Sequence, residues 1–283
     1  MQSIRVTVQG FELHALEYGE GPAVVLLHGF GNSSEDWRPT VELLGRSGYR
    51  AIAVDALGFG LSDKPADAPY SLTLYASLYQ GLVAALGLER ATFIAHSFGG
   101  KIAMATAVLY PERVEQLVLV DSEGFVPIPL LMRKGGTIPF LGEMMLWMSA
   151  RPQVLQAQLG AFFYEPKTYV TAELVNRAVA TLQDPAQRQA LLKLSRCYDD
   201  HDLVRSGIRA RLGELRCPTL ILWGEEDRVF SLASGQAAQR EIAGAQLVAF
   251  PRCGHFPQVE AFRGFHGVVL GFLAHGGKER EDQ

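Results

Sequence analysis

Hydrophobic and polar residues alternate near the N-terminus and then give way to short, continuously apolar runs. The alternation over residues 4–8 and 11–16 predicts a β-hairpin that turns at Gln9 and Gly10. Later apolar runs predict buried strands, and the segments between them have the periodicity of amphipathic helices. The predicted strands span residues 24–27, 51–54, 92–95, 114–120, 219–223 and 246–250, and the predicted helices span residues 35–46, 72–86 and 98–110. Repeated strand–helix units with fully apolar strands predict an α/β fold, with a mostly parallel central sheet and helices on both faces.

The alternation of predicted strands and helices stops between residues 122 and 215, where no strand pattern occurs. Helical periods replace it and predict helices over residues 142–150, 153–163, 171–182, 185–196 and 201–215. We therefore expect a helical lid, or cap, over residues 122–215, inserted between the two parts of an α/β core at residues 1–121 and 216–275. The polar segment 276–283 is expected to be a disordered tail.

The first part of the predicted lid is unusually apolar. Four of the six methionines of the chain lie between Met132 and Met148, among leucine, isoleucine, phenylalanine and tryptophan residues. For most of these side chains we expect packing of the lid against the core. Because methionine adapts to varied apolar ligands, the same stretch also suggests a roof over an apolar acyl or aryl pocket.

Composition and charge exclude several classes of protein. Among 283 residues, 48% are hydrophobic and 20% are charged, which is typical of a globular domain and not of a disordered one. A formal net charge of −4 without lysine- or arginine-rich runs argues against nucleic-acid binding. No apolar run is long enough for stable membrane insertion, and the first residues do not resemble a signal peptide, so we expect a cytoplasmic protein. Three scattered cysteines suggest neither disulfides nor a zinc site, and the sequence leaves a homodimer open.

Candidate chemistry begins at residues 95–100, which read Ala-His-Ser-Phe-Gly-Gly. They follow a predicted strand and open a predicted helix, which is the context of a nucleophile elbow. Small residues on both sides of Ser97 allow the sharp turn that would expose its hydroxyl. Alanine replaces the commoner first glycine of this pattern, and its small size makes it tolerable. Taken alone, Ser97 could also be a serine that caps a helix. Other segments of the sequence therefore decide whether it is a nucleophile.

Three further segments lie where a serine hydrolase needs them. The first predicted buried strand ends in His-Gly-Phe-Gly at residues 28–31, where a glycine-rich turn lets a backbone N–H approach a substrate oxygen. Another strand runs into Gly-Glu-Glu-Asp at residues 224–227, and the last strand precedes Gly254 and His255. A serine, then an acid, then a histidine, each beyond a strand, is the order found in α/β-hydrolases.

With these motifs the sequence resembles α/β-hydrolase-fold serine hydrolases of the carboxylesterase type over nearly its whole length. Residues 55–62, Asp-Ala-Leu-Gly-Phe-Gly-Leu-Ser, resemble a further loop of that family. The proline that often follows the acid loop in the family is absent here, which weakens the assignment of the acid. Asp121, at the end of a predicted strand, is therefore an alternative, because some family members place their carboxylate there.

The proposed roles follow from this arrangement. Ser97 would be the nucleophile, His255 the general base and Asp227 the group that orients the imidazole. The backbone N–H groups of Phe30 and Phe98 would form the oxyanion hole. We expect His28 to order the oxyanion loop and His96 to pack beneath the elbow, and we expect neither a cofactor nor a metal ion.

The function that we expect from the sequence is hydrolysis of small carboxylic esters of apolar acyl or aryl compounds through an acyl-enzyme on Ser97. One alternative is a carbon–carbon bond hydrolase that acts on diketone products of ring cleavage. A second alternative, from a different class, is a ligand-binding receptor that uses the same fold with little turnover.

Overall fold

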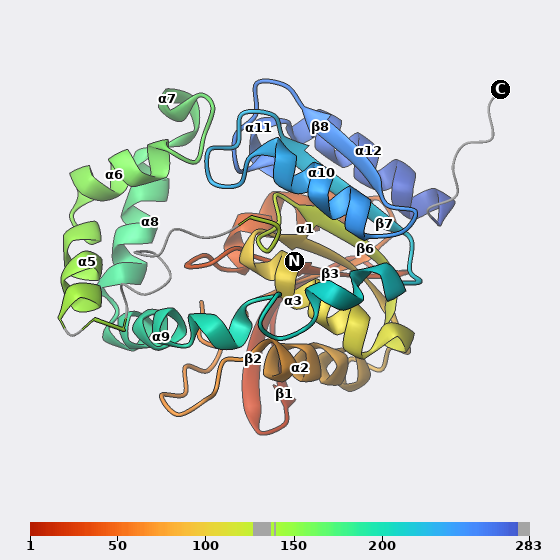
Figure 1. The fold of residues 1–283 in the computed structure, drawn as a ribbon, viewed down its shortest axis with the longest axis horizontal. Coiled ribbons are helices and arrows are strands. Elements are labelled where there is room, and N and C mark those ends of the chain that lie inside the picture. The colour runs from red at the N-terminus through yellow and green to blue at the C-terminus, as the bar shows by residue number, and fades with distance from the viewer. Residues whose placement is uncertain (127–136, 139, 277–283) are drawn as a thin grey trace.

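The centre of the molecule is a sheet of eight strands in the order β1-β2-β4-β3-β5-β6-β7-β8 (Figure 1). The computed structural model describes residues 1–126, 137–138 and 140–276. Antiparallel pairing joins β1 to β2 and β2 to β4, and all other neighbouring strands are parallel. The strands are β1 (Gln2–Val8), β2 (Phe11–Tyr18), β3 (Ala23–Leu27), β4 (Arg50–Val54), β5 (Ala91–His96), β6 (Val114–Val120), β7 (Thr219–Gly224) and β8 (Gln246–Phe250). The predicted α/β fold with a mostly parallel sheet is confirmed.

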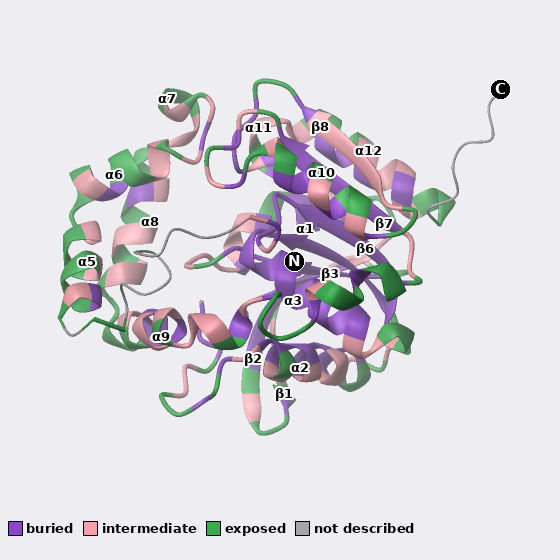
Figure 2. Cartoon of the chain, in the orientation of Figure 1, coloured by how far each residue is buried: buried purple, intermediate pink, exposed green. Residues whose placement is uncertain are grey.

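Two helical layers cover the sheet because alternate residues of each strand point to opposite faces. In β5, Phe93 belongs to the hydrophobic core shared with α2 and α3, whereas Ile94 belongs to the core shared with α1 and α12. The helices of the core are α1 (Arg38–Arg46), α2 (Leu72–Ala85), α3 (Phe98–Leu109), α10 (Leu232–Glu241), α11 (Pro257–Glu260) and α12 (Phe262–His275), with short 3-10 helices η1 (Ser34–Trp37) and η2 (Pro111–Arg113). Figure 2 shows the resulting buried centre, in which the middle strands carry almost no exposed residue.

A helical insert follows β6 and ends before β7, and Figure 1 places α5, α6 and α8 beside the core. Its helices are α5 (Leu141–Ser149), α6 (Pro152–Gly160), α7 (Pro166–Tyr169), α8 (Ala172–Gln183) and α9 (Pro185–Arg196), followed by the 3-10 helices η4 (Tyr198–His201) and η5 (Arg209–Glu214). Four of the predicted helices correspond to α5, α6, α8 and α9. The predicted tail at residues 276–283 lies outside the described residues except for Gly276.

The prediction of one helix over residues 201–215 is wrong. The chain forms η4 and η5 instead, with a turn between them. The carboxylate of Asp202 accepts hydrogen bonds from the backbone N–H groups of Val204 and Arg205, both at 2.9 Å. Such a local bond competes with helical pairing, and Gly207 then adopts a positive φ of 75°.

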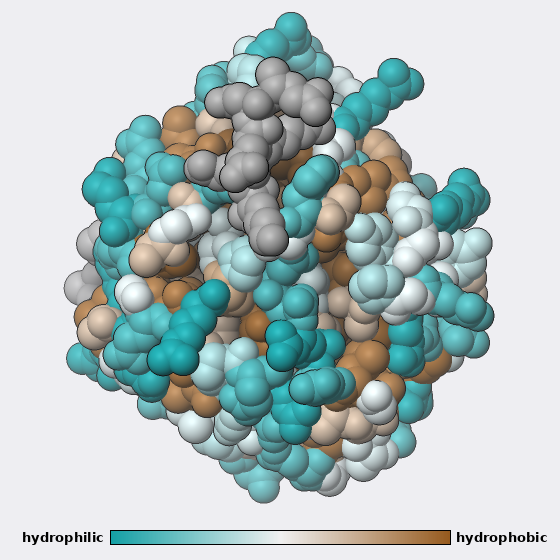
Figure 3. Space-filling view, turned by 90° about the vertical axis from the view of Figure 1, so that its right-hand side faces the viewer, coloured by the Kyte–Doolittle hydropathy of each residue, from teal (hydrophilic) through white to brown (hydrophobic). Residues whose placement is uncertain are grey.

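The expectation that most of the apolar start of the insert packs on the core is wrong for most of α5, although Leu146 does pack against the core. Trp147 is 56% exposed, and Met144, Met145 and Met148 are exposed as well; the preceding Phe140 is 84% exposed. Residues 127–136 of the same stretch lie outside the described residues. On the opposite side of the molecule, Figure 3 shows hydrophobic residues in small groups separated by hydrophilic ones. Among the described residues, none of the helices combines the length and hydrophobicity that crossing a membrane requires.

Candidate active site

Ser97 lies at a strained turn between β5 and α3. Its backbone has φ 52° and ψ −117°, a region that non-glycine residues rarely adopt. Hydrogen bonds hold the turn on both sides: Ser97 N–H donates to the carbonyl of Val120 at 2.9 Å, and the Ser97 carbonyl accepts from Gly100 at 2.9 Å and Glu123 at 3.2 Å. The strain therefore fixes the hydroxyl at the carboxyl end of the sheet, where the side chain of residue 97 remains slightly accessible at 8%.

Three loops that are far apart in sequence bring His255 and Asp227 to this hydroxyl. The distance from His255 Nε2 to Ser97 Oγ is 3.1 Å, and that from His255 Nδ1 to Asp227 Oδ2 is 2.8 Å. The second carboxylate oxygen of Asp227 accepts from the backbone N–H groups of Val229 and Phe230. Because a carboxylate only accepts, His255 carries its proton on Nδ1 and presents the lone pair of Nε2 to Ser97. The arrangement can therefore remove the serine proton.

Asp121, the alternative acid, is close to these residues but is differently bonded. Its Oδ1 accepts from the backbone N–H of Gly224 at 3.0 Å. Burial, reinforced by the neighbouring charge of Asp227, raises the pKa of Asp121 well above its usual range. The imidazole of His255 thus bonds to Asp227, whereas burial and the charge of Asp227 favour the protonated form of Asp121.

Phe30 and Phe98 approach one another at the mouth of the site. Their rings meet edge to face with centroids 5.8 Å apart, and both contact the ring of Phe59. Phe98 is the first residue of α3, so its N–H has no partner within the helix and lies at the positive end of the helix dipole. Among the hydrogen bonds of the described residues, neither Phe30 N–H nor Phe98 N–H has an acceptor. The side chains of the two residues thus touch, and the oxyanion hole formed by their N–H groups stays a prediction.

The two other histidines near the elbow have structural hydrogen bonds. His96 Nε2 donates to the backbone carbonyl of His255 at 2.7 Å, and burial lowers the pKa of His96 well below its usual range. His28 Nδ1 donates to the carbonyl of Gly29 at 2.7 Å, and its Nε2 accepts from Ala56 N–H at 3.0 Å. His28 therefore holds the loop that carries Phe30, and His96 supports the loop that carries the base.

Two residues of the site were missed by reasoning from the sequence. The carbonyl of Phe162, at the end of α6, accepts from the backbone N–H of His255 at 2.7 Å. The carboxylate of Glu260 accepts from the backbone N–H groups of Gly254 and Tyr164. Both contacts join the insert to the histidine loop. Neither residue has a motif, because a backbone carbonyl can come from any residue type and Glu260 lies in an ordinary helical turn.

A cavity of about 310 Å³ adjoins the site between the insert and the core. Gly31 and Phe256, which follow Phe30 and His255 in the sequence, line one part of the cavity. Residues of α8 line another part. Arg177 of α8 is the one cationic side chain among the described lining residues, and it pairs with Asp36 of η1 at 3.0 Å. Burial raises the pKa of Asp36 to about 6. Below that pH, Asp36 loses its charge, and Glu35 and Glu173 are the remaining carboxylates that line the cavity with Arg177.

The ligand atoms of Asp121, Asp227 and His255 lie within 4.8 Å of one another, which is the spacing of a metal site. His255 Nδ1, however, donates to Asp227, and a protonated ring nitrogen cannot bind a cation. This donor set suits proton transfer better than metal binding. The absence of a metal stays a prediction.

The close packing of the turn at Ser97 predicts that a methyl group added at Gly99 lowers the stability of the protein. A Cβ on Gly99 would lie 2.8 Å from Leu27 Cβ and from the carbonyl oxygens of Leu27 and His28. Backbone of the central strand cannot move aside, so Gly99→Ala is expected to lower the free energy of unfolding by about 1–3 kcal/mol in urea titrations. The matched control is Gly267→Ala in α12, where a Cβ meets nothing within 4 Å. We expect that change to stabilise by about 0.5–1 kcal/mol, and equal effects of the two changes would contradict the prediction.

Comparisons with known proteins agree with this geometry. The sequence model described as the alpha/beta hydrolase fold matches residues 22–262. A 2-hydroxy-6-oxononadienedioate/2-hydroxy-6-oxononatrienedioate hydrolase of Comamonas testosteroni is 31% identical over 278 residues, covering 95% of this chain and 93% of the relative. A 2-hydroxy-6-oxo-6-phenylhexa-2,4-dienoate hydrolase of Burkholderia cepacia is 31% identical over 277 residues, with the same coverage. The structure of a meta-cleavage product hydrolase of Pseudomonas fluorescens IP01 superposes with a TM-score of 0.83 at 28% identity, covering 96% of this chain and 97% of that one.

The chain belongs to the α/β hydrolase fold family. The resemblance found from the motifs is therefore confirmed at the level of the family. The narrower expectation of a carboxylesterase is not supported by these relatives: the two sequence relatives are named for 6-oxo compounds, the solved structure is named for a meta-cleavage product, and none is named for an ester. Short strand and loop motifs describe machinery that both groups share, and so they could not separate the two activities.

Proposed function

We propose that the protein hydrolyses a carbon–carbon bond in 2-hydroxy-6-oxo-dienoates, the compound class named for its relatives. The observation that carries the proposal is the hydrogen-bonded set Ser97, His255 and Asp227 in a chain that aligns with such hydrolases over 95% of its length. These compounds contain no ester, so hydrolysis must break the bond between the C6 carbonyl carbon and C5. Ester hydrolysis, our expectation from the sequence, becomes the second candidate because the same residues would let an ester transfer its acyl group to Ser97 and release its alcohol.

Hydrolysis of a carbon–carbon bond needs a carbon atom as the leaving group, whereas in ester hydrolysis the leaving group is an oxygen atom. A proton must first move from the 2-hydroxyl group to C5, which converts the dienol into a diketone. C5 then lies between the C6 ketone and an enone, so the electron pair released at C5 can delocalise onto the C2 carbonyl oxygen. The bond to C6 can therefore break heterolytically with C5 as the leaving group.

The residues of the site take the following parts in this proposal. His255 Nε2 accepts the proton of Ser97 while Oγ attacks C6, and Asp227 stabilises the imidazolium. The N–H groups of Phe30 and Phe98 stabilise the oxyanion at C6. When the C5–C6 bond breaks, His255 returns the proton to the dienolate. Water activated by His255 then hydrolyses the acyl group from Ser97, giving a carboxylic acid and a 2-hydroxydienoate.

We further propose that residues 122–215 act as the cap over this site, as expected from the sequence. Supporting contacts run from the insert to the core: Phe162 bonds to His255, Arg177 pairs with Asp36, and Gln187 Nε2 donates to the carbonyl of Gly58 at 2.8 Å. A cap held at several points would exclude water from the acyl-enzyme and enclose an apolar substituent on C6.

Arg177 is suited to the carboxylate of a dienoate because it is the cation of the adjoining cavity. Arg177→Gln is expected to raise KM for the dienoate by about 10- to 100-fold, since hydrogen bonds to charged groups contribute about 1.5–3 kcal/mol. KM for an uncharged p-nitrophenyl ester should change little. The matched control is Arg196→Gln, because Arg196 pairs with Glu143 within the insert and does not line this cavity. An equal rise in KM for both substrates would show that Arg177 does not recognise the carboxylate.

The proposed function is tested by comparing kcat/KM for a 2-hydroxy-6-oxo-6-phenyl dienoate with that for p-nitrophenyl esters of rising acyl length. We expect the dienoate, followed by the loss of dienolate absorbance, to have the higher value. Faster turnover of an ester than of the dienoate would overturn the carbon–carbon assignment and favour an esterase. Binding of the dienoate without turnover of either class would favour the receptor.

A further inference from the structure

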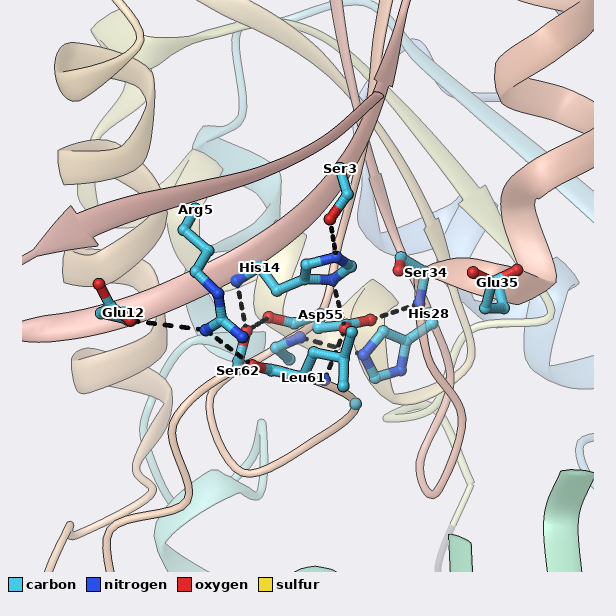
Figure 4. A network of polar contacts seen from close by, with 12 residues as sticks. Ser3, Arg5, Glu12, His14, His28, Ser34, Glu35, Asp55, Leu61 and Ser62 are labelled. Carbon is cyan, nitrogen blue, oxygen red and sulfur yellow. Dashed lines mark hydrogen bonds and ion pairs between the residues drawn. The ribbon is translucent and has the colours of Figure 1, made fainter. Parts of the chain in front are cut away.

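A second set of serine, histidine and aspartate lies toward the edge of the sheet that β1 and β2 form. Ser3 comes from β1, His14 from β2 and Asp55 from the residue that follows β4 (Figure 4). Ser3 Oγ lies 2.8 Å from His14 Nε2, and His14 Nδ1 lies 2.8 Å from Asp55 Oδ2. The order of atoms is therefore the same as in Ser97, His255 and Asp227.

The hairpin places Ser3 and His14 together. Gln9 and Gly10 both have positive φ, 52° and 83°, as a two-residue hairpin turn requires. This turn fixes a register in which Arg5 lies opposite His14. Ser3 is two residues from Arg5 and thus on the same face of the sheet, diagonal to His14, within reach of the imidazole.

The hydrogen bonds of Asp55 determine which ring nitrogen of His14 carries the proton. The carboxylate also accepts from Ser34 N–H at 2.6 Å and from Leu61 N–H at 2.8 Å. Burial alone would raise the pKa of Asp55, but the hydrogen bonds from His14 and from these backbone groups, with the nearby His28, lower it to about 2. An ionised carboxylate can only accept, so His14 Nδ1 is the donor. His14 Nε2 is then the acceptor of the Ser3 hydroxyl proton.

The burial of the three residues suits an activated nucleophile. His14 and Asp55 are buried, whereas Ser3 is exposed on β1, the edge strand of the sheet. A base that is held in one tautomer by a buried carboxylate and bonded to an accessible hydroxyl is the arrangement that activates serine.

We propose that Ser3 is a second nucleophile of this protein, which accepts acyl or phosphonyl groups from small electrophiles such as aryl esters and fluorophosphonates. His14 Nε2 takes the proton from Ser3 while Oγ bonds to the carbonyl carbon. The bond from that carbon to the aryl oxygen breaks, and His14 returns the proton to the departing phenolate. The products are O-acyl-Ser3 and a phenol. With a fluorophosphonate, Oγ bonds to phosphorus, the P–F bond breaks and fluoride leaves, and the proton taken by His14 passes to water.

The edge site differs from the elbow in how it can stabilise an oxyanion. Ser3 lies within a strand and not at the N-terminus of a helix, so the helix dipole that acts at Phe98 is missing. We therefore expect slow, stoichiometric modification of Ser3 in place of rapid turnover.

The test uses full-length protein with Ser97→Ala, so that its outcome does not depend on the proposed function. After reaction with a fluorophosphonate probe and digestion with trypsin, the peptide from Met1 to Arg5 should carry the label on Ser3, its one hydroxyl residue. The label on this peptide should disappear in the double variant Ser97→Ala/Ser3→Ala, in which the buried residues His14 and Asp55 are unchanged.

Ser47 is the matched control, because it is exposed and its hydroxyl donates to the carbonyl of Leu43 and not to a base. We expect Ser3 to react about 10²-fold faster than Ser47, the lower range for general base catalysis. His14→Gln in the Ser97→Ala background should abolish this difference, provided that its melting curve shows a folded protein. Absence of label on Ser3, or equal labelling of Ser3 and Ser47, would overturn the proposal whatever the stability of the His14 variant.

Discussion

Replacing Ser97 with alanine is expected to lower kcat for the 6-oxo-dienoate by about 10⁵- to 10⁶-fold, the loss typical of removing the nucleophile of a triad. The hydroxyl is 3.1 Å from His255 Nε2, and its backbone is fixed in a strained turn, so no neighbouring group can replace it. Steady-state kinetics and mass spectrometry of the trapped acyl-enzyme would measure the effect.

The matched control for this change is Ser122→Ala. Ser122 is a buried serine beside Gly100 whose hydroxyl has no hydrogen-bond partner among the described residues. We expect its removal to leave kcat nearly unchanged. A Ser97→Ala variant that keeps more than about a tenth of the wild-type kcat would show that another residue forms the covalent bond.

The second large effect is expected from Asp227→Asn, which should lower kcat by about 10⁴-fold. An amide can donate to His255 Nδ1 and would then favour the wrong tautomer, in which Nε2 carries the proton and cannot act as a base. Measurement of kcat for both the dienoate and an ester would show the loss with each substrate, because both reactions need the same base.

The parallel change Asp121→Asn decides between the two candidate acids. Burial and the charge of Asp227 raise the pKa of Asp121 and favour its neutral form, so an amide of the same shape should keep kcat close to the wild-type value. Its Oδ1 would still accept from Gly224 N–H. If Asp121→Asn lost as much activity as Asp227→Asn, the two carboxyl groups would have to act as a unit.

Much of the fold was predictable because its strands are buried on both faces. Such strands read as short apolar runs, and each run ends where the chain turns toward the site. Small residues around Ser97 and the turn at residues 28–31 are required by local backbone geometry, so these motifs stand out in the sequence. The proximity of Ser97, His255 and Asp227 then follows from the order of the parallel strands.

Other features were not predictable, because they depend on contacts between distant segments. The segment at residues 201–215 has a helical pattern, yet the side chain of Asp202 and the positive φ of Gly207 break it. The apolar residues of α5 suggest core packing or a roof over a pocket, but nothing in their spacing tells which surface they face. Ester and carbon–carbon bond hydrolysis use the same loops, so the motifs do not distinguish their substrates. The hydrogen bond from His255 to Phe162 has no sequence signal at all.

That last bond makes the reactivity of the histidine conditional on the position of α6. Any movement that draws Phe162 away to admit a substrate also takes an acceptor from the backbone N–H of His255. The hydrogen bond therefore links the alignment of the imidazole to the position of Phe162 in the insert.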